Sequence, residues 1–580
     1  MSDLLMEPVK YFEQEGRGEF DQNAHQYFDE LVAKSGIDVD ANRATVREYN
    51  AENEIIKTLD KRMSRFKTLR VFLIIGIVIC LIVFAASFGQ FEEKVWVGIL
   101  MLVLGLGLAG GGIYLWFWKI NPILKDANAE KEKHVEKANE LLAEAQAQMA
   151  PLNALFDNTD TFKLIEKTIP ELSFDRSFNR EHEDKFLNHF GFVDIVDDEM
   201  SIADTLSGRM CQNPFLFFRY KQHVMGTETY TGSLVITWTE TYRDSDGDIR
   251  TRTRTQTLTA SVEKPKPYYH METALGYGCQ AAPDLNFSRD AAHTEKLSDK
   301  EIAKKVRSGE KELQKQARKA TKEGGSFQEM ANSEFDVLFG ANDRDQEVQF
   351  RLMFTPLAQR NTVALLKDLN GWGDDFNFVK RGRYNLIESE HAQDWDMDTG
   401  ATNYWSYDVD QAREKFTTRN NAYFKSIFFD FAPLMSIPAY MEEPSFSMEP
   451  MEYGSNYTYY EHEAMANALG QDAFAHEDAH TESILKTQFQ GKQGNSDIVS
   501  VTAYAYTTEE RIDYIPVKGG DGYYHQVPVP WIEYIPVEKT SNMAVQALGI
   551  TEREFRANPD ITANLTTDWA YFHEMISYLC

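Results

Sequence analysis

Two uncharged apolar runs decide the fold: VFLIIGIVICLIVFAASF at Val71–Phe88 and VWVGILMLVLGLGLAGGGIYLWFW at Val95–Trp118. They contain 18 and 24 residues and no Asp, Glu, Lys or Arg. At about 1.5 Å of rise per residue, each run is long enough to cross a hydrocarbon core of roughly 30 Å. The sequence therefore predicts two transmembrane helices that contact the lipid bilayer.

The six residues between the runs, Gly89–Lys94 (GQFEEK), allow only a tight antiparallel hairpin. Cations flank its open end, at Lys61, Arg62, Arg65, Lys67 and Arg70 on one side and Lys119, Lys125, Lys131 and Lys133 on the other. Because positive charge stays in the cytoplasm, we expect a two-pass protein of the cell membrane with both termini cytoplasmic. No apolar run precedes residue 69, so we expect no cleavable signal.

Two sequence features indicate how the hairpin sits and packs. Trp96, Trp116 and Trp118 stand at the run ends, where aromatic side chains concentrate at the membrane–water interface. Gly107 and Gly111 form a GxxxG pair that lets two helix backbones approach closely. We favour close packing within the hairpin for this pair, and self-association into a homo-oligomer is the alternative. Neither run contains Asp, Glu, Lys, Arg or His, which argues against transport through the hairpin.

Helical patterns continue on both sides of the hairpin. Helices are expected at 1–66, the hairpin at 67–119 and a helical stalk at 120–150. In the stalk Val135, Ala138, Leu142, Ala145 and Met149 repeat at spacings of 3 and 4, a short coiled-coil seam. We therefore expect both membrane helices to extend into the cytoplasm and pair there.

The remaining chain alternates between helical and strand-like segments. Two β-hairpins are predicted, at 231–262 around an Asp-Gly turn and at 497–537 around Lys518–Gly522 (KGGDG). Between them, 294–323 has ten Lys and Arg against six Asp and Glu and is predicted to form a charged helix interrupted by Gly309 and Gly324. The prediction is an α+β body with a first soluble domain at 151–370 and an acidic C-terminal domain at 371–580.

Charge limits the classes of partner. The 580 residues contain 60 Lys and Arg against 90 Asp and Glu, a net charge of −30, which argues against nucleic acid as a partner. Residues 441–580 hold 22 Asp and Glu against 7 Lys and Arg, so this region is where we expect a basic protein partner. The four cysteines are too few and too scattered for a disulfide scaffold and fit a reducing cytoplasm.

Two segments carry a family resemblance. They are FDR at Phe174–Arg176 with EHEDKF at Glu181–Phe186 and FGF at Phe190–Phe192, and FDVLF at Phe335–Phe339 with EVQFRLMFTPL at Glu347–Leu357. This pattern resembles a module of uncharacterised bacterial membrane proteins with two transmembrane helices followed by a cytoplasmic domain of unknown function. The resemblance covers about a tenth of the chain and implies architecture and a bacterial location, not an activity.

One motif has catalytic content. His476-Glu477-Asp478-Ala479-His480 matches HExxH, which on a helix places both histidines on one face as Zn²⁺ ligands, with Glu477 as general base. Three features argue against a zinc site: the charge of Asp478, the lack of a following third ligand, and polar residues all round the segment. We favour a solvated acidic helix over 461–489.

Other chemical signatures are weaker. Asp394, Asp396 and Asp398 alternate like Ca²⁺ ligands, but Thr399 and Trp405 stand where an EF-hand loop needs Gly and Glu. The P-loop and nucleophile-elbow patterns are missing from the sequence. We therefore expect a non-enzymatic, oligomeric membrane protein whose acidic cytoplasmic domain scaffolds or recruits partners. The alternative is a membrane-tethered zinc metallopeptidase that uses His476, Glu477 and His480.

Overall fold

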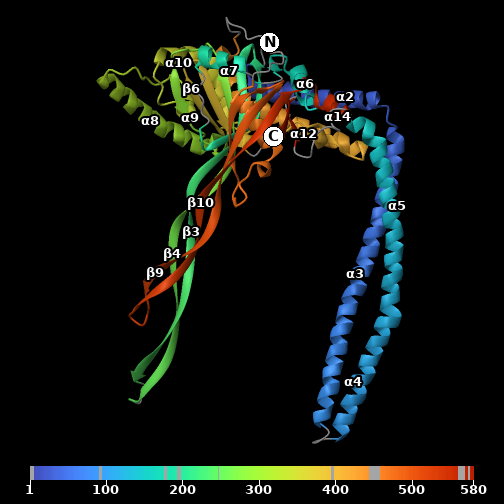
Figure 1. Cartoon of the computed structure of the whole chain (residues 1–580). Coiled ribbons are helices and arrows are strands. Elements are labelled where there is room, and N and C mark those ends of the chain that lie inside the picture. The colour runs from blue at the N-terminus through green and yellow to red at the C-terminus, as the bar shows by residue number, and fades with distance from the viewer. Residues whose placement is uncertain are drawn as a thin grey trace. The chain divides into compact units, whose positions relative to one another are not determined.

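The chain folds into two compact units (Figure 1). Unit 1 comprises Met1–Ala24, Asp157–Gly400 and Arg419–Cys580, and unit 2 comprises His25–Phe156 and Ala401–Thr418. Helices α2 (Arg17–Ser35) and α12 (Val409–Met435) each contribute residues to both units. The computed structural model describes residues 5–90, 95–175, 178, 180–191, 197–243, 245, 247–393, 397–442, 457–558, 569–572 and 575–580.

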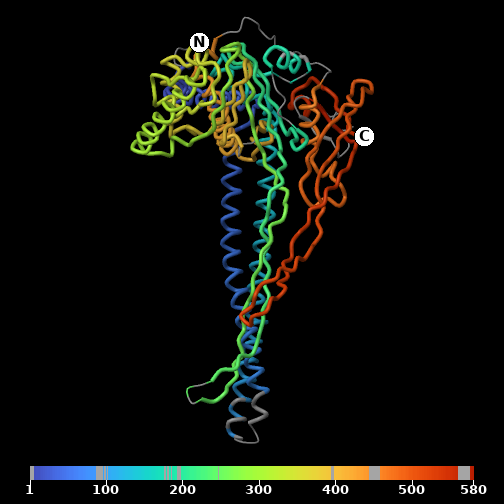
Figure 2. The backbone as a smooth tube through the Cα atoms, turned by 90° about the vertical axis from the view of Figure 1, so that its left-hand side faces the viewer, coloured from blue at the N-terminus to red at the C-terminus, as the bar shows by residue number. Residues whose placement is uncertain are grey.

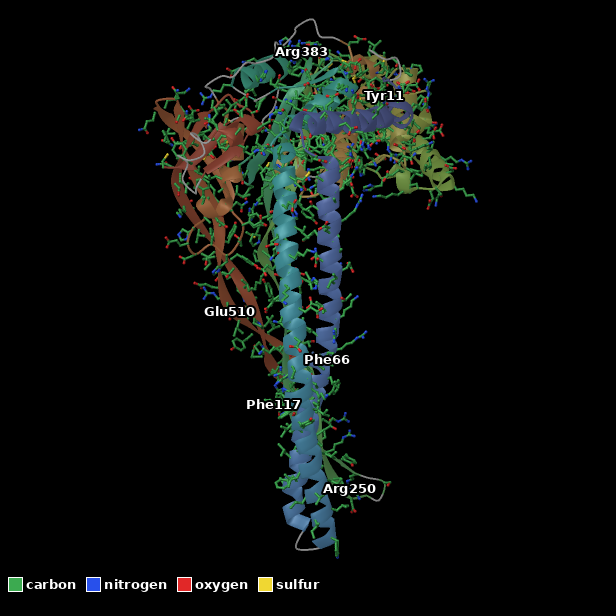
Figure 3. All side chains as sticks on the ribbon, turned by 90° about the vertical axis from the view of Figure 1, so that its right-hand side faces the viewer. Tyr11, Phe66, Phe117, Arg250, Arg383 and Glu510 are labelled. Atoms are coloured by element: carbon green, nitrogen blue, oxygen red, sulfur yellow. The ribbon has the colours of Figure 1, made fainter. Side chains whose placement is uncertain are left out.

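Unit 2 is built on a long helical hairpin. Helix α3 (Val39–Gln90) is antiparallel to α4 (Val95–Leu115), a π-helical turn (Trp116–Ile120) and α5 (Asn121–Asn153). The Asp38 carboxylate accepts the amide of Ala41 and so caps the start of α3. Phe66 of α3 and Phe117 of the π-helical turn mark the two sides of this hairpin (Figure 3).

Helices α3 and α5 pair through a buried seam and charged contacts. Glu52 is 7% exposed; its carboxylate lies 2.6 Å from His134 Nδ1 and 2.7 Å from Lys137 Nζ. Hydrogen bonds hold the pKa of Glu52 below its usual range, and the bond from Lys137 has a larger effect than the bond from His134. The buried face of α5 follows Ala138, Leu141, Ala145 and Met149. Leu141 therefore takes the place in the seam that was predicted for Leu142. Leu142 and Val135 are each only half-buried.

Unit 1 contains a seven-stranded antiparallel sheet in the order β1-β2-β3-β4-β7-β6-β5. Its strands are β1 (Leu172–Phe174), β2 (Met200–Met210), β3 (Asn213–Arg243), β4 (Ile249–Gly278), β5 (Asn286–Arg289), β6 (Phe376–Arg381) and β7 (Tyr384–Ser389). Strands β6 and β7 follow residue 370, so this one sheet takes strands from both sides of the domain boundary predicted there.

A second antiparallel sheet has five strands in the order β11-β12-β10-β9-β8. Its strands are β8 (Ile484–Gln493), β9 (Ser496–Lys518), β10 (Tyr524–Ala547), β11 (Trp569–Phe572) and β12 (Met575–Leu579). The other helices of unit 1 are α1 (Pro8–Tyr11), α6 (Asp160–Thr168), α7 (Arg180–Lys185), α8 (Asp299–Glu323), α9 (Ser333–Phe339), α10 (Glu347–Met353), α11 (Pro356–Leu366), α13 (Tyr459–Leu469) and α14 (Glu552–Ala557).

Helix α13 links the cores of the two sheets. Tyr460 and Ala464 belong to the apolar cluster of the seven-stranded sheet, with Phe218 of β3 among its members. Met465 and Ala466 belong to the cluster of the five-stranded sheet, with Val501 of β9. One helix therefore packs against the apolar clusters of both sheets.

Strands β3 and β4, and likewise β9 and β10, extend from the sheets as long hairpins (Figure 2). At about 3.3 Å per residue, a strand as long as β3 spans roughly 100 Å. The two hairpins pack together through Ile236, Leu258 and Val527. The approach is close at Gly232, where an added Cβ would lie 1.9 Å from the Pro528 carbonyl oxygen. Only glycine leaves room for this contact.

The predicted α+β class with antiparallel hairpins is confirmed, and both predicted hairpins form in the expected segments. Helix α8 begins with a capping box of Ser298 and Glu301 and ends at Gly324, whose φ of 77° lies in the left-handed region. The break predicted at Gly309 is wrong, since this residue lies inside α8 with the side chain of Val337 against it.

Candidate functional site

The apolar helical hairpin of α3 and α4 is the main candidate site of unit 2. Two helices of this unit are long and apolar enough to cross a membrane. Their apolar side chains are exposed on the outer surface: Phe72 is 66% exposed, Ile82 62% and Leu108 63%. A continuous apolar surface of this length is typical of helices that face lipid, because water penalises it at about 25 cal/mol per Å².

Two glycines seat α4 against α3. A Cβ added at Gly105 would lie 3.0 Å from the carbonyl oxygen of Cys80 and 3.1 Å from the amide nitrogen of Phe84. A Cβ at Gly112 would lie 2.8 Å from Ile77 Cγ1. The two glycines are seven residues apart and so share one face of α4. This face, and not the GxxxG pair, makes the close contact within the hairpin.

Gly107 and Gly111 lie elsewhere on α4. Among the described residues, nothing comes within 4 Å of a Cβ built at either position. The favoured interpretation of this pair, close packing inside the hairpin, is therefore not what the structure contains. Both positions remain open to a partner outside the hairpin.

Aromatic and basic residues gather where the apolar runs meet the polar helices. The guanidinium of Arg70 lies 5.4 Å from the centre of the Trp116 ring. The Trp116 indole N–H donates to Asn121 Oδ1 at 3.2 Å, and Trp118 stacks on Tyr114. Trp96, at the other end of α4, is 84% exposed. The predicted loop Gly89–Lys94 lies partly outside the described residues, which resume at Val95.

The HExxH segment does not form a helix. Helix α13 ends at Leu469, β8 begins at Ile484, and residues 476–480 lie in the turn between them. The amide of Asp478 donates to His476 Nδ1 at 3.1 Å, and His480 Nδ1 lies 2.7 Å from Thr508 Oγ1. The spacing of four residues therefore does not place the two histidines on one helix face. The geometry that would make Glu477 a general base beside a metal is not formed.

The expected solvated helix over 461–489 is also wrong. Glu461, His462 and Glu463 of α13 are each at most 2% exposed. Glu461 accepts the amide of Phe178, and Glu463 accepts the amide of Ile202, each at 2.9 Å. Burial raises the pKa of both carboxyls, well above the usual range for Glu461. The two carboxylates accept hydrogen bonds from strand and loop amides in the core. The polarity of the sequence alone does not reveal this role.

As far as the chain is described, the remaining candidates give no assembled metal site. Asp394 and Asp396 of the Ca²⁺-like segment lie outside the described residues, while Asp398 accepts a hydrogen bond from the amide of Gly400. Within the described part of the chain, no three His, Cys, Asp or Glu side chains are grouped so that they could hold a metal ion.

A buried polar cluster was missed by sequence reasoning. His391 Nδ1 lies 2.7 Å from Asp375 and its Nε2 3.4 Å from Asp430, while Trp372 stacks on the imidazole at 4.0 Å. Burial lowers the pKa of His391, but Asp430 and Asp375 outweigh it and raise the pKa above the usual value. Burial raises the pKa of Asp430 to about 6. These residues are spread over 59 positions, from Trp372 to Asp430, with no local motif, so only the fold brings them together.

Comparisons with family models, with curated proteins and with solved structures find no match to this chain. The function is therefore argued from its own residues.

Proposed function

We propose that this chain is a two-pass integral membrane protein that presents unit 1 in the cytoplasm as a scaffold or recruitment module. The observation that carries the proposal is the exposed apolar surface of the α3–α4 hairpin, represented by Phe72, Ile82 and Leu108. Burying this surface in lipid removes the cost of hydrating it. The backbone hydrogen bonds of both helices are internal, as a membrane span requires.

The charge distribution supports the cytoplasmic orientation. Arg70 and Lys119 stand at the polar end of the hairpin beside Trp116 and Trp118, whereas Glu92 and Glu93 dominate the connecting loop. Positive residues are retained on the cytoplasmic side during insertion, and indole rings favour the interface. Both long polar segments leave the hairpin at its basic end, so unit 1 follows them into the cytoplasm. The resemblance to uncharacterised bacterial membrane proteins points to the same arrangement in a bacterial cell membrane.

The open glycine face supports self-association. Gly107 and Gly111 allow close approach of a second α4 helix, since nothing described in the chain occupies that face. Oligomerisation through this face would gather several copies of unit 1. The acidic 441–580 region then offers a repeated surface to a basic protein partner.

The C-terminal residue provides a native reporter of topology. Cys580 is exposed, Cys211 and Cys279 are buried, and Cys80 lies within the first apolar run. A membrane-impermeant maleimide should label Cys580 only after cells are permeabilised. A Gln90→Cys variant, with its new thiol at the last residue of α3 and between the two apolar runs, should be labelled in intact cells. Labelling of Cys580 in intact cells, or release of the protein from membranes by alkaline carbonate, would contradict the proposal.

A further inference from the structure

A cleft of about 480 Å³ lies between the two sheets of unit 1, near the bases of the long hairpins. Its walls come from β3 and β4 on one side and from β8, β9 and β10 on the other. Ile484 and Ala505 are buried apolar residues of its lining, and three tyrosines, one histidine and three carboxylates complete the polar and aromatic part. The apolar hairpin does not use this cleft, whose strands β8, β9 and β10 belong to the acidic 441–580 region proposed above to receive a basic protein partner.

His223 is the buried polar group of the cleft. Its side chain is 8% exposed, and its Nδ1 is hydrogen-bonded to the Glu199 carboxylate. Because a carboxylate accepts, Nδ1 carries the proton and Nε2 of the neutral ring is an acceptor. Among the described residues, Nε2 has no hydrogen-bond partner. A buried acceptor left without a donor is destabilising, so a ligand that donates an N–H is favoured here.

The charge of the cleft is negative. Asp198, Glu199 and Glu538 line it, and its described lining contains no Lys or Arg. Lys221 lies two residues before His223 on β3 and is held by Glu482 at 2.5 Å. Lys486 donates to the backbone oxygens of Asp197 and Met200 and is paired with Glu463. Because both lysines are paired with carboxylates outside the lining, the described lining is net negative, which favours a positively charged ligand.

Three tyrosine rings give the cleft aromatic walls. Tyr269 and Tyr506 flank the imidazole of His223, each with its ring centre 5.4 Å away. Thr481 holds the Tyr269 ring and the Tyr506 backbone: its hydroxyl pairs with the Tyr269 hydroxyl at 3.2 Å and accepts the Tyr506 backbone amide at 2.9 Å. Tyr504 is 44% exposed and offers its ring to a ligand. Aromatic faces attract cations, and rings already held in place lose little entropy on binding.

We infer that this cleft binds a primary alkylammonium group, carried either by a lysine side chain or by a small aliphatic amine. The N–H groups of the ammonium donate to His223 Nε2 and to the carboxylates, while its alkyl stem lies against the tyrosine rings and the apolar floor. A quaternary ammonium lacks the N–H that His223 requires. The inference rests on the cleft alone and does not depend on membrane insertion.

The test uses the purified full-length protein in detergent micelles and titration calorimetry. The probes are Nα-acetyl-lysine methylamide, cadaverine, and two lysine probes of altered head group, Nε-acetylated and Nε-trimethylated. We expect both primary ammonium probes to bind and the acetylated probe to show no binding, with the trimethylated probe at least threefold weaker than the lysine probe. Tighter binding of cadaverine than of the lysine probe would assign the site to small amines, and the reverse order to a protein lysine.

Matched variants locate binding in the cleft. Tyr504→Leu and Glu538→Gln should each weaken the lysine probe about threefold to tenfold, the range that one cation–π or charge contact supplies. The controls Tyr514→Leu and Glu510→Gln make the same chemical changes on β9, outside the cleft lining, and should stay within twofold (Figure 3 labels Glu510). All four side chains are exposed, so the variants should retain the wild-type unfolding temperature.

Three results would overturn the inference: equal binding of the acetylated and charged probes, no binding of any primary ammonium at millimolar concentration, or equal effects of the cleft and control variants. Loss of membrane association in the topology experiment would leave these binding results unchanged, so failures of the two proposals are distinguishable.

Discussion

Substituting Gly112 by alanine should loosen the α3–α4 hairpin. The new Cβ would lie 2.8 Å from Ile77 Cγ1 and 3.4 Å from Leu73 Cδ2. Unbonded carbons are at optimal separation at about 3.5–4.0 Å, so the closest contact is too short by about 0.7 Å or more. Ile77 is β-branched and has one strongly preferred χ1 rotamer in a helix, so its side chain cannot easily rotate away. The helices must separate instead, at a cost of about 1–3 kcal/mol.

Unfolding of the full-length protein in mixed micelles measures this cost. Helical circular dichroism is followed against the mole fraction of sodium dodecyl sulfate for the wild type and for Gly112→Ala. Gly105→Ala should behave in the same way, because it would meet two backbone atoms, Cys80 O and Phe84 N, and the Phe84 Cβ, which cannot rotate away from its backbone. Both variants should unfold at lower detergent fraction.

The outer glycines provide the matched control. Gly107→Ala and Gly111→Ala add the same methyl group where nothing described lies within 4 Å, so the hairpin should keep its stability to within about 0.5 kcal/mol. Their expected effect is on self-association, measured by the mass of the micellar complex. The reasoning is refuted if Gly107→Ala destabilises the hairpin as much as Gly112→Ala, or if Gly112→Ala has no effect.

Three further predictions concern unit 1. Arg344→Met should cost about 3–5 kcal/mol in chemical unfolding, because it leaves the Asp336 carboxylate buried without its cation and leaves Glu347 with Arg351 as its remaining cation. Burial raises the pKa of Asp430 from 3.8 to about 6, so the folded state binds this proton more tightly than the unfolded state. Its contribution to stability is complete below about pH 4 and is lost as the pH rises to about 6. Asp430→Asn should reduce this dependence of the unfolding temperature on pH. Gly232→Ala should separate the two long hairpins at the Pro528 carbonyl and speed their cleavage by protease.

Each of these has a control of the same kind. Arg351→Met removes a half-exposed partner of Glu347 and should cost less than about 1 kcal/mol. The hydrogen bond from Arg43 lowers the pKa of Asp410, so its stabilisation is present above about pH 4 and lost as the pH falls, the opposite sign to Asp430. Ser233→Ala changes an exposed neighbour of Gly232 and should leave proteolysis unchanged. Equal effects in any pair would contradict the corresponding argument.

Local patterns were sufficient for several elements of the fold. In each β-hairpin, the strands alternate apolar and polar residues and are joined by a turn that contains glycine, at Gly247 in one and at Gly519–Gly522 in the other. Both hairpins form. The charged segment of α8 carries its own capping box and terminal glycine. In each case the residues that determine the element are neighbours in sequence, so their preferences can be read without the rest of the chain.

The candidate sites depended on context that local patterns do not contain. HExxH matches a helical motif, but its residues lie in a turn whose His480 and Thr481 hold the Tyr506 backbone. The acidic sequence of α13 predicted a solvated helix. Its carboxylates instead accept hydrogen bonds from backbone amides more than 250 residues away in the sequence. A polar residue favours burial only when partners surround it, and those partners come from distant segments.

The sequence by itself determined four features: two uncharged apolar helices long enough to cross a membrane, the cations that flank them, two β-hairpins, and a strongly acidic C-terminal part. Each of these features is a property of consecutive residues. Tertiary structure alone decided that Gly105 and Gly112, not Gly107 and Gly111, seat the helices, and that His223, Tyr504 and Glu538 share one cleft. Helix rotation and sheet packing select these contacts, and both are set by the burial of whole surfaces and not by any single motif.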